Sequence, residues 1–147
     1  MTEAGEQYAP FSEMRHGEER RILYKNDESP SRVVIGRDPL TKSASPAEKQ
    51  MDDFRIKLSD ADRTISRRAV ILDVFTKAID ITNTGQLEIL YRTEPEQVWR
   101  GIPPNEKVKL KNTVNEMRNF ELKIGKLTLR SGLVGGEEKA LQSLILI

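Results

Sequence analysis

Apolar and polar side chains alternate along most of the chain from Phe54 onward. Apolar residues occupy every second position in short runs, and turn-forming residues separate the runs roughly every eight to twelve residues. Successive side chains of a β-strand point to opposite faces of a sheet, so this period of two predicts strands with one buried face. Short, regularly spaced strands are typical of an antiparallel sandwich or barrel. The sequence therefore predicts an all-β fold, an antiparallel β-sandwich, with strands at 54–58, 70–75, 79–81, 87–91, 108–110, 120–124 and 127–129.

The composition of the remaining segments divides the chain into three parts. Residues 1–19 are acidic and have few apolar side chains, so we expect a flexible N-terminal arm. The sandwich is expected at 20–131. Residues 132–147 begin with glycine-rich sequence and end on four apolar side chains. We expect a boundary and an apolar tail there, which either links to a further region, the alternative favoured here, or packs back on the sandwich.

Further elements are expected outside the alternating region. Short strands are predicted at 22–24 and 32–36, where apolar residues precede turn-forming ones. Proline is tolerated in the first turn of a helix, so Pro46 indicates a short helical piece within the loop at 44–53. The helix-forming composition after Gly136 predicts a second one.

The composition removes several classes of function. The chain has 147 residues, no cysteine and one histidine, which excludes disulfides, thiolate metal sites and multi-histidine sites. With 24 Lys+Arg against 23 Asp+Glu, the net charge of +1 gives no overall attraction to nucleic acid or to anionic membranes. No run is long and apolar enough to span a membrane, and the start lacks a secretory signal. We expect a cytoplasmic protein that is not an enzyme and that has no catalytic residues, cofactor or metal.

Polar and basic residues gather where three expected strands meet their loops. The chain reads VVIGRD at 33–38, ISRR at 65–68 and DITNTG at 80–85. Loops at one end of a sandwich often carry binding residues, so we expect these segments to converge. Guanidinium groups, a hydroxyl and an amide together suit a phosphate, which arginine can bind through two oxygens at once. The candidate residues are Gly36, Arg37, Ser66, Arg67, Asn83 and Gly85.

The order of these motifs resembles that of the forkhead-associated (FHA) domain. The resemblance covers roughly residues 20–131, and its motifs are IGR at 35–37, IKLSD at 56–60, ISRR at 65–68 and DITNTG at 80–85. It implies a β-sandwich that binds phosphothreonine-containing proteins or peptides and mediates phosphorylation-dependent protein–protein interaction. The residues that would bind the phosphopeptide are Arg37, Ser66, Arg67 and Asn83, with Gly36 and Gly85 structural at the site.

Two positions depart from the pattern of this family. Ala69 stands where the family has a histidine that braces the phosphate-binding loop, so the bracing hydrogen bonds must come from other groups. Asn83-x-Gly85 is the nearest match to the family's Asn-Gly pair. An alternative function is therefore a degenerate FHA-like scaffold or assembly domain that binds its partners independently of phosphate.

Nucleic acid and a second copy of the chain are two other classes of partner. Residues 105–130 hold seven Lys/Arg against three Asp/Glu, but the lysines alternate with apolar residues as on the solvated face of a strand. Without interleaved aromatic residues for base stacking, we do not expect nucleic-acid binding. Self-association is a further hypothesis, because a phosphorylated Thr2 in the acidic arm could reach the site of a second copy.

Each candidate residue also has a purely structural interpretation. Arg37 could pair with Asp38 on the surface, while Ser66 and Asn83 could serve only to form their loops. Arg68 is expected to alternate outward along its strand. The aromatic side chains of Trp99 and Phe120 are expected in the core.

Overall fold

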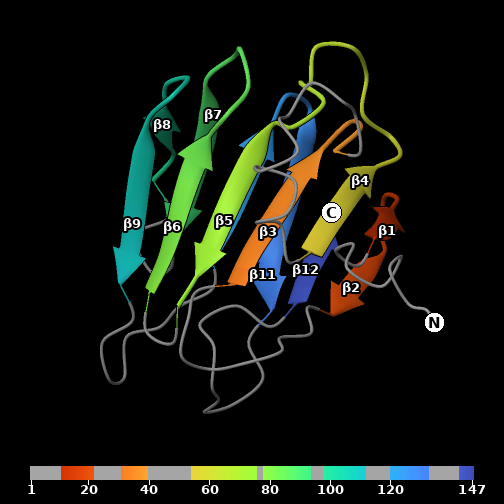
Figure 1. Cartoon of the computed structure of the whole chain (residues 1–147), viewed down its shortest axis with the longest axis horizontal. Coiled ribbons are helices and arrows are strands. Elements are labelled where there is room, and N and C mark those ends of the chain that lie inside the picture. The colour runs from red at the N-terminus through yellow and green to blue at the C-terminus, as the bar shows by residue number, and fades with distance from the viewer. Residues whose placement is uncertain are drawn as a thin grey trace, which may run out of the picture.

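The computed structural model describes residues 11–21, 31–39, 54–75, 78–93, 98–111, 120–132 and 143–147, and these ranges form strands and loops without a helix. One sheet has the strand order β1 (Phe11–Met14), β4 (Phe54–Leu58), β3 (Ser31–Gly36), β5 (Val70–Val74), β6 (Ala78–Asn83) and β9 (Lys107–Lys111). The other has the order β2 (Glu19–Arg21), β12 (Ser143–Leu146), β11 (Leu127–Gly132), β10 (Phe120–Ile124), β7 (Ile89–Thr93) and β8 (Arg100–Ile102). The two sheets lie face to face (Figure 1).

One hydrophobic core fills the space between the sheets. Ile35, Leu72 and Ile81 of the first sheet and Leu122 and Leu144 of the second are all fully buried in a single cluster. Burial of such a side chain contributes about 1.5–3 kcal/mol, so the period-two pattern stabilises the fold at many positions along the chain. The predicted all-β class with two packed sheets is confirmed.

The pairing of the first sheet differs from the prediction. Strand β4 runs parallel to both of its neighbours, β1 and β3, whereas the other neighbouring strands described are antiparallel. Parallel neighbours need a connection of a dozen or more residues, and residues 37–53 between β3 and β4 supply it. The sheet is therefore mixed, because side-chain alternation specifies which face is buried but not the direction of a strand.

The sandwich also extends beyond its predicted limits at 20 and 131. Strand β1 lies within the segment expected as an arm, and its Met14 is fully buried. Strand β12 lies within the expected tail, where Leu144 and Leu146 enter the core while Ile145 between them is only half-buried. These apolar residues pack back on the sandwich, the alternative that the sequence analysis did not favour.

The other expectations meet mixed outcomes. The strand at 22–24 and the helical pieces at 44–53 and at 137–142 lie outside the described residues, whereas 143–146 form a strand. Phe120 is in the core, as predicted. Trp99 is not, since its half-buried ring lies 4.5 Å below the guanidinium carbon of Arg92. Nowhere in the described ranges is there a helix long and apolar enough to span a membrane.

Strand register brings the loops of interest to one rim of the sandwich. Ile35 of β3 pairs with Val70 of β5, and Val70 pairs with Asn83 of β6. The segments next to these three residues, which include Gly36, Ala69 and Thr84, therefore leave the sheet side by side. They lie at the upper edge of the sandwich in Figure 1.

Candidate functional site

Gly36 allows the end of β3 to approach the loop before β5 very closely. A Cβ atom at this position would lie 2.0 Å from the carbonyl oxygen of Arg67 and 2.9 Å from the backbone nitrogen of Ala69. Backbone hydrogen bonds hold the two segments together: the N–H of Arg37 donates to Ser66 O at 3.1 Å, and the N–H of Ala69 donates to Ile35 O at 2.9 Å. Glycine is needed here because only a residue without a side chain fits.

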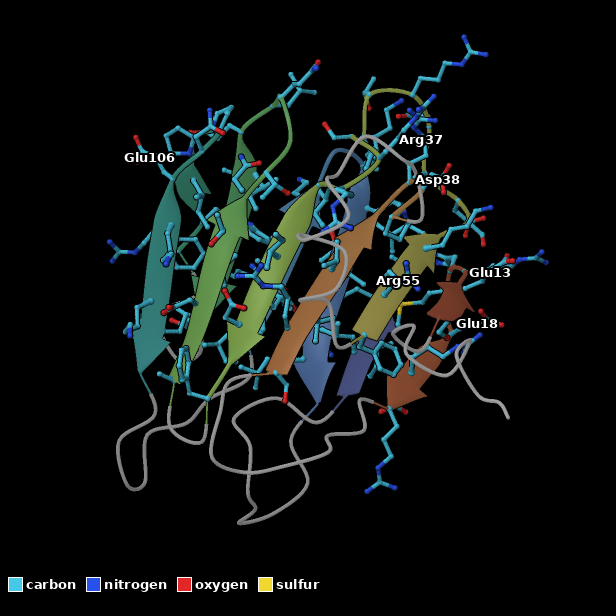
Figure 2. The ribbon with its side chains drawn as sticks, viewed as in Figure 1. Glu13, Glu18, Arg37, Asp38, Arg55 and Glu106 are labelled. Carbon is cyan, nitrogen blue, oxygen red and sulfur yellow. The ribbon has the colours of Figure 1, made fainter. Side chains whose placement is uncertain are left out.

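The guanidinium of Arg37 is anchored at one end and open at the other. Its Nε donates to the backbone oxygen of Ile65 at 3.0 Å. Among the residues that the structure describes, the Arg37 side chain has no other partner, and Asp38 provides none although both lie at the rim in Figure 2. The two Nη groups therefore remain available, and a planar fork of this kind matches two oxygens of a phosphate.

Ser66 connects the site to the β6–β7 turn. Its Oγ accepts a hydrogen bond from the N–H of Gln86 at 3.1 Å, so the hydroxyl hydrogen can still be donated to a ligand. A Cβ at Gly85 would lie 2.8 Å from this Oγ, so glycine is what permits the turn to approach. Gly36 and Gly85 thus each permit a close approach between segments of this rim.

Asn83 is placed differently from the expectation. It is 0% exposed, and its side-chain amide donates to Leu87 O and to Ile102 O, both at 2.8 Å. Its Oδ1 accepts from the N–H of Gly85 at 2.9 Å. The prediction that this side chain holds a peptide backbone is therefore corrected: Asn83 shapes the turn from inside, which is its structural interpretation, and both amide hydrogens are used.

The bracing expected of a histidine at position 69 comes from other groups. Thr84 Oγ1 donates to Arg68 O at 2.7 Å, and the N–H of Thr84 donates to Ala69 O at 3.1 Å. A void of about 20 Å³ lies between Ala69, Ser66 and Asn83, room for about one water molecule. The two loops are therefore joined without an imidazole, and little space is left for one.

The converging loops enclose an open groove of about 710 Å³ on the rim. Four arginines line it, and we call it the arginine groove: Arg37, Arg63, Arg67 and Arg68. Hydroxyl and amide groups come from Thr64, Ser66, Thr84 and Gln86, and apolar contacts from Ile71 and Leu87. None of the described lining residues carries a carboxylate. The groove therefore combines positive charge with hydrogen-bond donors, a composition suited to anions.

Sequence reasoning missed several lining residues. Arg68 was expected to point away, yet it lines the groove, where its Nη1 donates to the backbone oxygen of Pro39 at 3.2 Å. Arg63 stands in the same basic run as Ser66, and Thr84 and Gln86 flank Gly85. Their proximity in the sequence to Ser66 and Gly85 was the signal that could have identified these lining residues.

Two carboxylates near the groove, those of Asp62 and Asp60, accept hydrogen bonds from neighbouring loop segments. Asp62 Oδ1 accepts hydrogen bonds from the hydroxyl and the N–H of Thr64, and these bonds hold the pKa of Asp62 below its ordinary value. Asp60 Oδ2 accepts from the N–H of His16 at 2.6 Å. Each carboxylate thus fixes backbone at a different place.

Comparison of the chain with protein-family models, curated proteins and solved structures gave no match.

Proposed function

We propose that the chain is a non-catalytic phosphothreonine-peptide recognition module of the FHA type, which mediates phosphorylation-dependent protein–protein interaction. The observation that carries the proposal is the open fork of Arg37 beside the Ser66 hydroxyl, in a groove lined by four arginines and no described carboxylate.

A phosphate group suits this arrangement in charge and in geometry. Phosphothreonine carries a charge of about −1.5 to −2 at neutral pH and offers three strong acceptor oxygens. The Arg37 fork would bind two of them, and the Ser66 hydroxyl could donate to a phosphate oxygen while its Oγ still accepts from Gln86. Arg67 would add a further guanidinium from the same rim. The surrounding backbone is already fixed, so little ordering is needed on binding.

Apolar residues beside the arginines favour a peptide over free phosphate. Leu87 is 55% exposed, unusually so for a large hydrophobic residue, and lines the groove together with Ile71. We infer that these side chains contact the threonine methyl or neighbouring residues of the ligand. Phosphoserine should therefore bind more weakly than phosphothreonine.

The positions of four residues support the resemblance to FHA domains. Gly36, Arg37, Ser66 and Arg67 meet at one rim of a two-sheet sandwich, as that resemblance requires. Asn83 takes no part in ligand contact, so the peptide backbone would be held by other groups. Thr84 and Gln86 are exposed at the same rim and are suited to that role.

Affinity measurements with a phosphothreonine peptide from a degenerate library test the proposal. Arg37→Ala removes charge-assisted hydrogen bonds worth about 1.5–3 kcal/mol, so we expect affinity to fall about 10- to 150-fold. The variant loses one hydrogen bond to Ile65 O, so folding stability should fall by only about 1 kcal/mol. Arg21→Ala is the matched control, because Arg21 is an exposed arginine of β2 outside the groove.

The comparison with unphosphorylated peptide decides between the two candidate functions. The proposal predicts measurable binding of the phosphorylated peptide alone, with Arg21→Ala equal to wild type. Equal binding of phosphorylated and plain peptides across the library would reject phosphate recognition and favour a scaffold that is independent of phosphate.

A further inference from the structure

The arginine groove offers room for more than one anion. Four arginines line it, and none of the described lining residues carries a carboxylate. Its volume of about 710 Å³ falls within the usual range of ligand sites, about 300–1,000 Å³, and exceeds what a single phosphate fills.

Arg63 provides a second cation on a well-supported loop. The N–H of Thr64 donates to Asp62 Oδ1 at 2.9 Å, and the N–H of Ile65 donates to Asp62 O at 3.1 Å. Ile65 is buried in the core, so the backbone around Arg63 is anchored. The Arg63 side chain is exposed and has no hydrogen-bond or ion-pair partner among the residues that the structure describes.

Arg63 and Arg37 are held in different ways. The Arg37 guanidinium is tied by its Nε to Ile65 O, whereas that of Arg63 reaches the same groove from the turn that precedes Ile65. Two open guanidinium groups on separate backbone supports can each receive an anion. Asp62, the carboxylate next to Arg63 in the chain, is engaged with Thr64 and is not among the lining residues.

On the basis of the phosphopeptide function proposed above, we propose that the preferred ligand is a doubly phosphorylated segment. One phosphothreonine binds at Arg37 and Ser66, and a second phosphorylated residue nearby in the same peptide binds at Arg63. Each phosphate then meets a guanidinium group that the described residues leave open, that of Arg37 or that of Arg63, in a groove whose described lining carries no carboxylate.

The test uses peptides of one sequence in three forms: one phosphothreonine, the same phosphothreonine plus a second phosphorylated residue, and the phosphothreonine plus aspartate at that second position. A set of spacings between two and six residues covers the unknown distance. We expect the best doubly phosphorylated peptide to bind at least about 10-fold more tightly than the singly phosphorylated one, with an increment that shrinks as salt is raised.

Substitutions separate this inference from the function on which it rests. In Arg63→Ala the doubly phosphorylated peptide should bind no more tightly than the singly phosphorylated one, because the increment of the second phosphate is lost, and Arg37→Ala should weaken the binding of both peptides. Arg21→Ala should change neither. Equal affinities of singly and doubly phosphorylated peptides at all spacings, or an increment that survives Arg63→Ala, would overturn the inference and leave the proposed function intact.

Two further outcomes are distinguishable from these. If the peptide with aspartate at the second position binds as tightly as the doubly phosphorylated one, the inference is also overturned. Arg63 would then bind carboxylates as well as phosphates. Singly phosphorylated peptides that bind no better than plain ones would instead refute the proposed function itself.

Discussion

Substitution of Gly36 by alanine probes the contact on which the rim depends. The added methyl group would lie 2.0 Å from Arg67 O, 2.6 Å from the carbonyl carbon of that residue and 2.9 Å from Ala69 N. All three are backbone atoms inside a hydrogen-bonded loop, so none can turn away as a side chain could. The loop and the end of β3 would have to separate.

The cost of that separation can be worked out from the hydrogen bonds that join the segments. Three backbone bonds span the contact: Arg37 N–H to Ser66 O, Asp38 N–H to Arg67 O, and Ala69 N–H to Ile35 O, at 3.1, 3.1 and 2.9 Å. At about 1 kcal/mol each, their loss amounts to about 3 kcal/mol. Native domains are stable by only about 5–15 kcal/mol, so the change is large.

Urea denaturation followed by the fluorescence of the single tryptophan, Trp99, measures this cost. Gly101→Ala is the matched control, because the three heavy atoms nearest to its added Cβ all belong to the carboxylate of Glu88, the closest 2.2 Å away, on an exposed side chain that can move. Both variants lose the same glycine entropy in the unfolded chain, so the comparison isolates the close contact.

The two variants should differ clearly. We expect Gly36→Ala to lose about 3 kcal/mol and its phosphopeptide affinity, and Gly101→Ala to stay within about 0.5 kcal/mol of wild type. The reasoning is refuted if Gly36→Ala matches Gly101→Ala in stability and still binds phosphopeptide as wild type does.

Two further predictions concern buried polar groups. Asn83→Ala leaves Leu87 O and Ile102 O without their donors and should destabilise the fold by about 2–4 kcal/mol in urea denaturation; a loss under about 0.5 kcal/mol would contradict the role assigned to the amide. Burial tends to raise the pKa of Glu121, but hydrogen bonds from Arg92 and Arg130 outweigh it and hold the pKa below its ordinary value. The resulting stability is fully present above pH of about 4.3 and is lost as the pH falls through the folded pKa. Glu121→Gln should therefore cost about 1–3 kcal/mol at pH 7, and thermal melts should show this deficit shrinking below pH of about 4, whereas a constant deficit would exclude the charge as its source.

Much of the sheet structure was predictable because many strands bury one face. In strands β4, β5 and β10 a buried apolar side chain occupies every second position over five residues, long enough for a period of two to be recognised, although Arg55 and Glu121 between them are buried as well. Strand β8 spans three residues, one of them Gly101, and gives no such signal. In β1, Met14 is the one residue that enters the described core. A single core residue gives no periodic signal, so the prediction rested on composition, which indicated a polar arm.

The candidate site was predictable to the extent that short motifs specify backbone geometry. Gly36, Arg37, Ser66 and Arg67 meet because strand ends of one sheet must lie side by side. The burial of Asn83 was not predictable, because its register with Val70 and the carbonyl groups that it meets belong to distant segments.

The central claim is that the arginine groove binds a phosphate borne by threonine. Backbone amide chemical shifts in ¹H–¹⁵N spectra test it most directly, with one peptide added in its phosphorylated and its plain form. The account predicts shifts for the phosphorylated form that are confined to 36–38, 63–69 and 84–87, and no comparable shifts for the plain form. Equal shifts with both forms, or shifts centred away from these three segments, would contradict it.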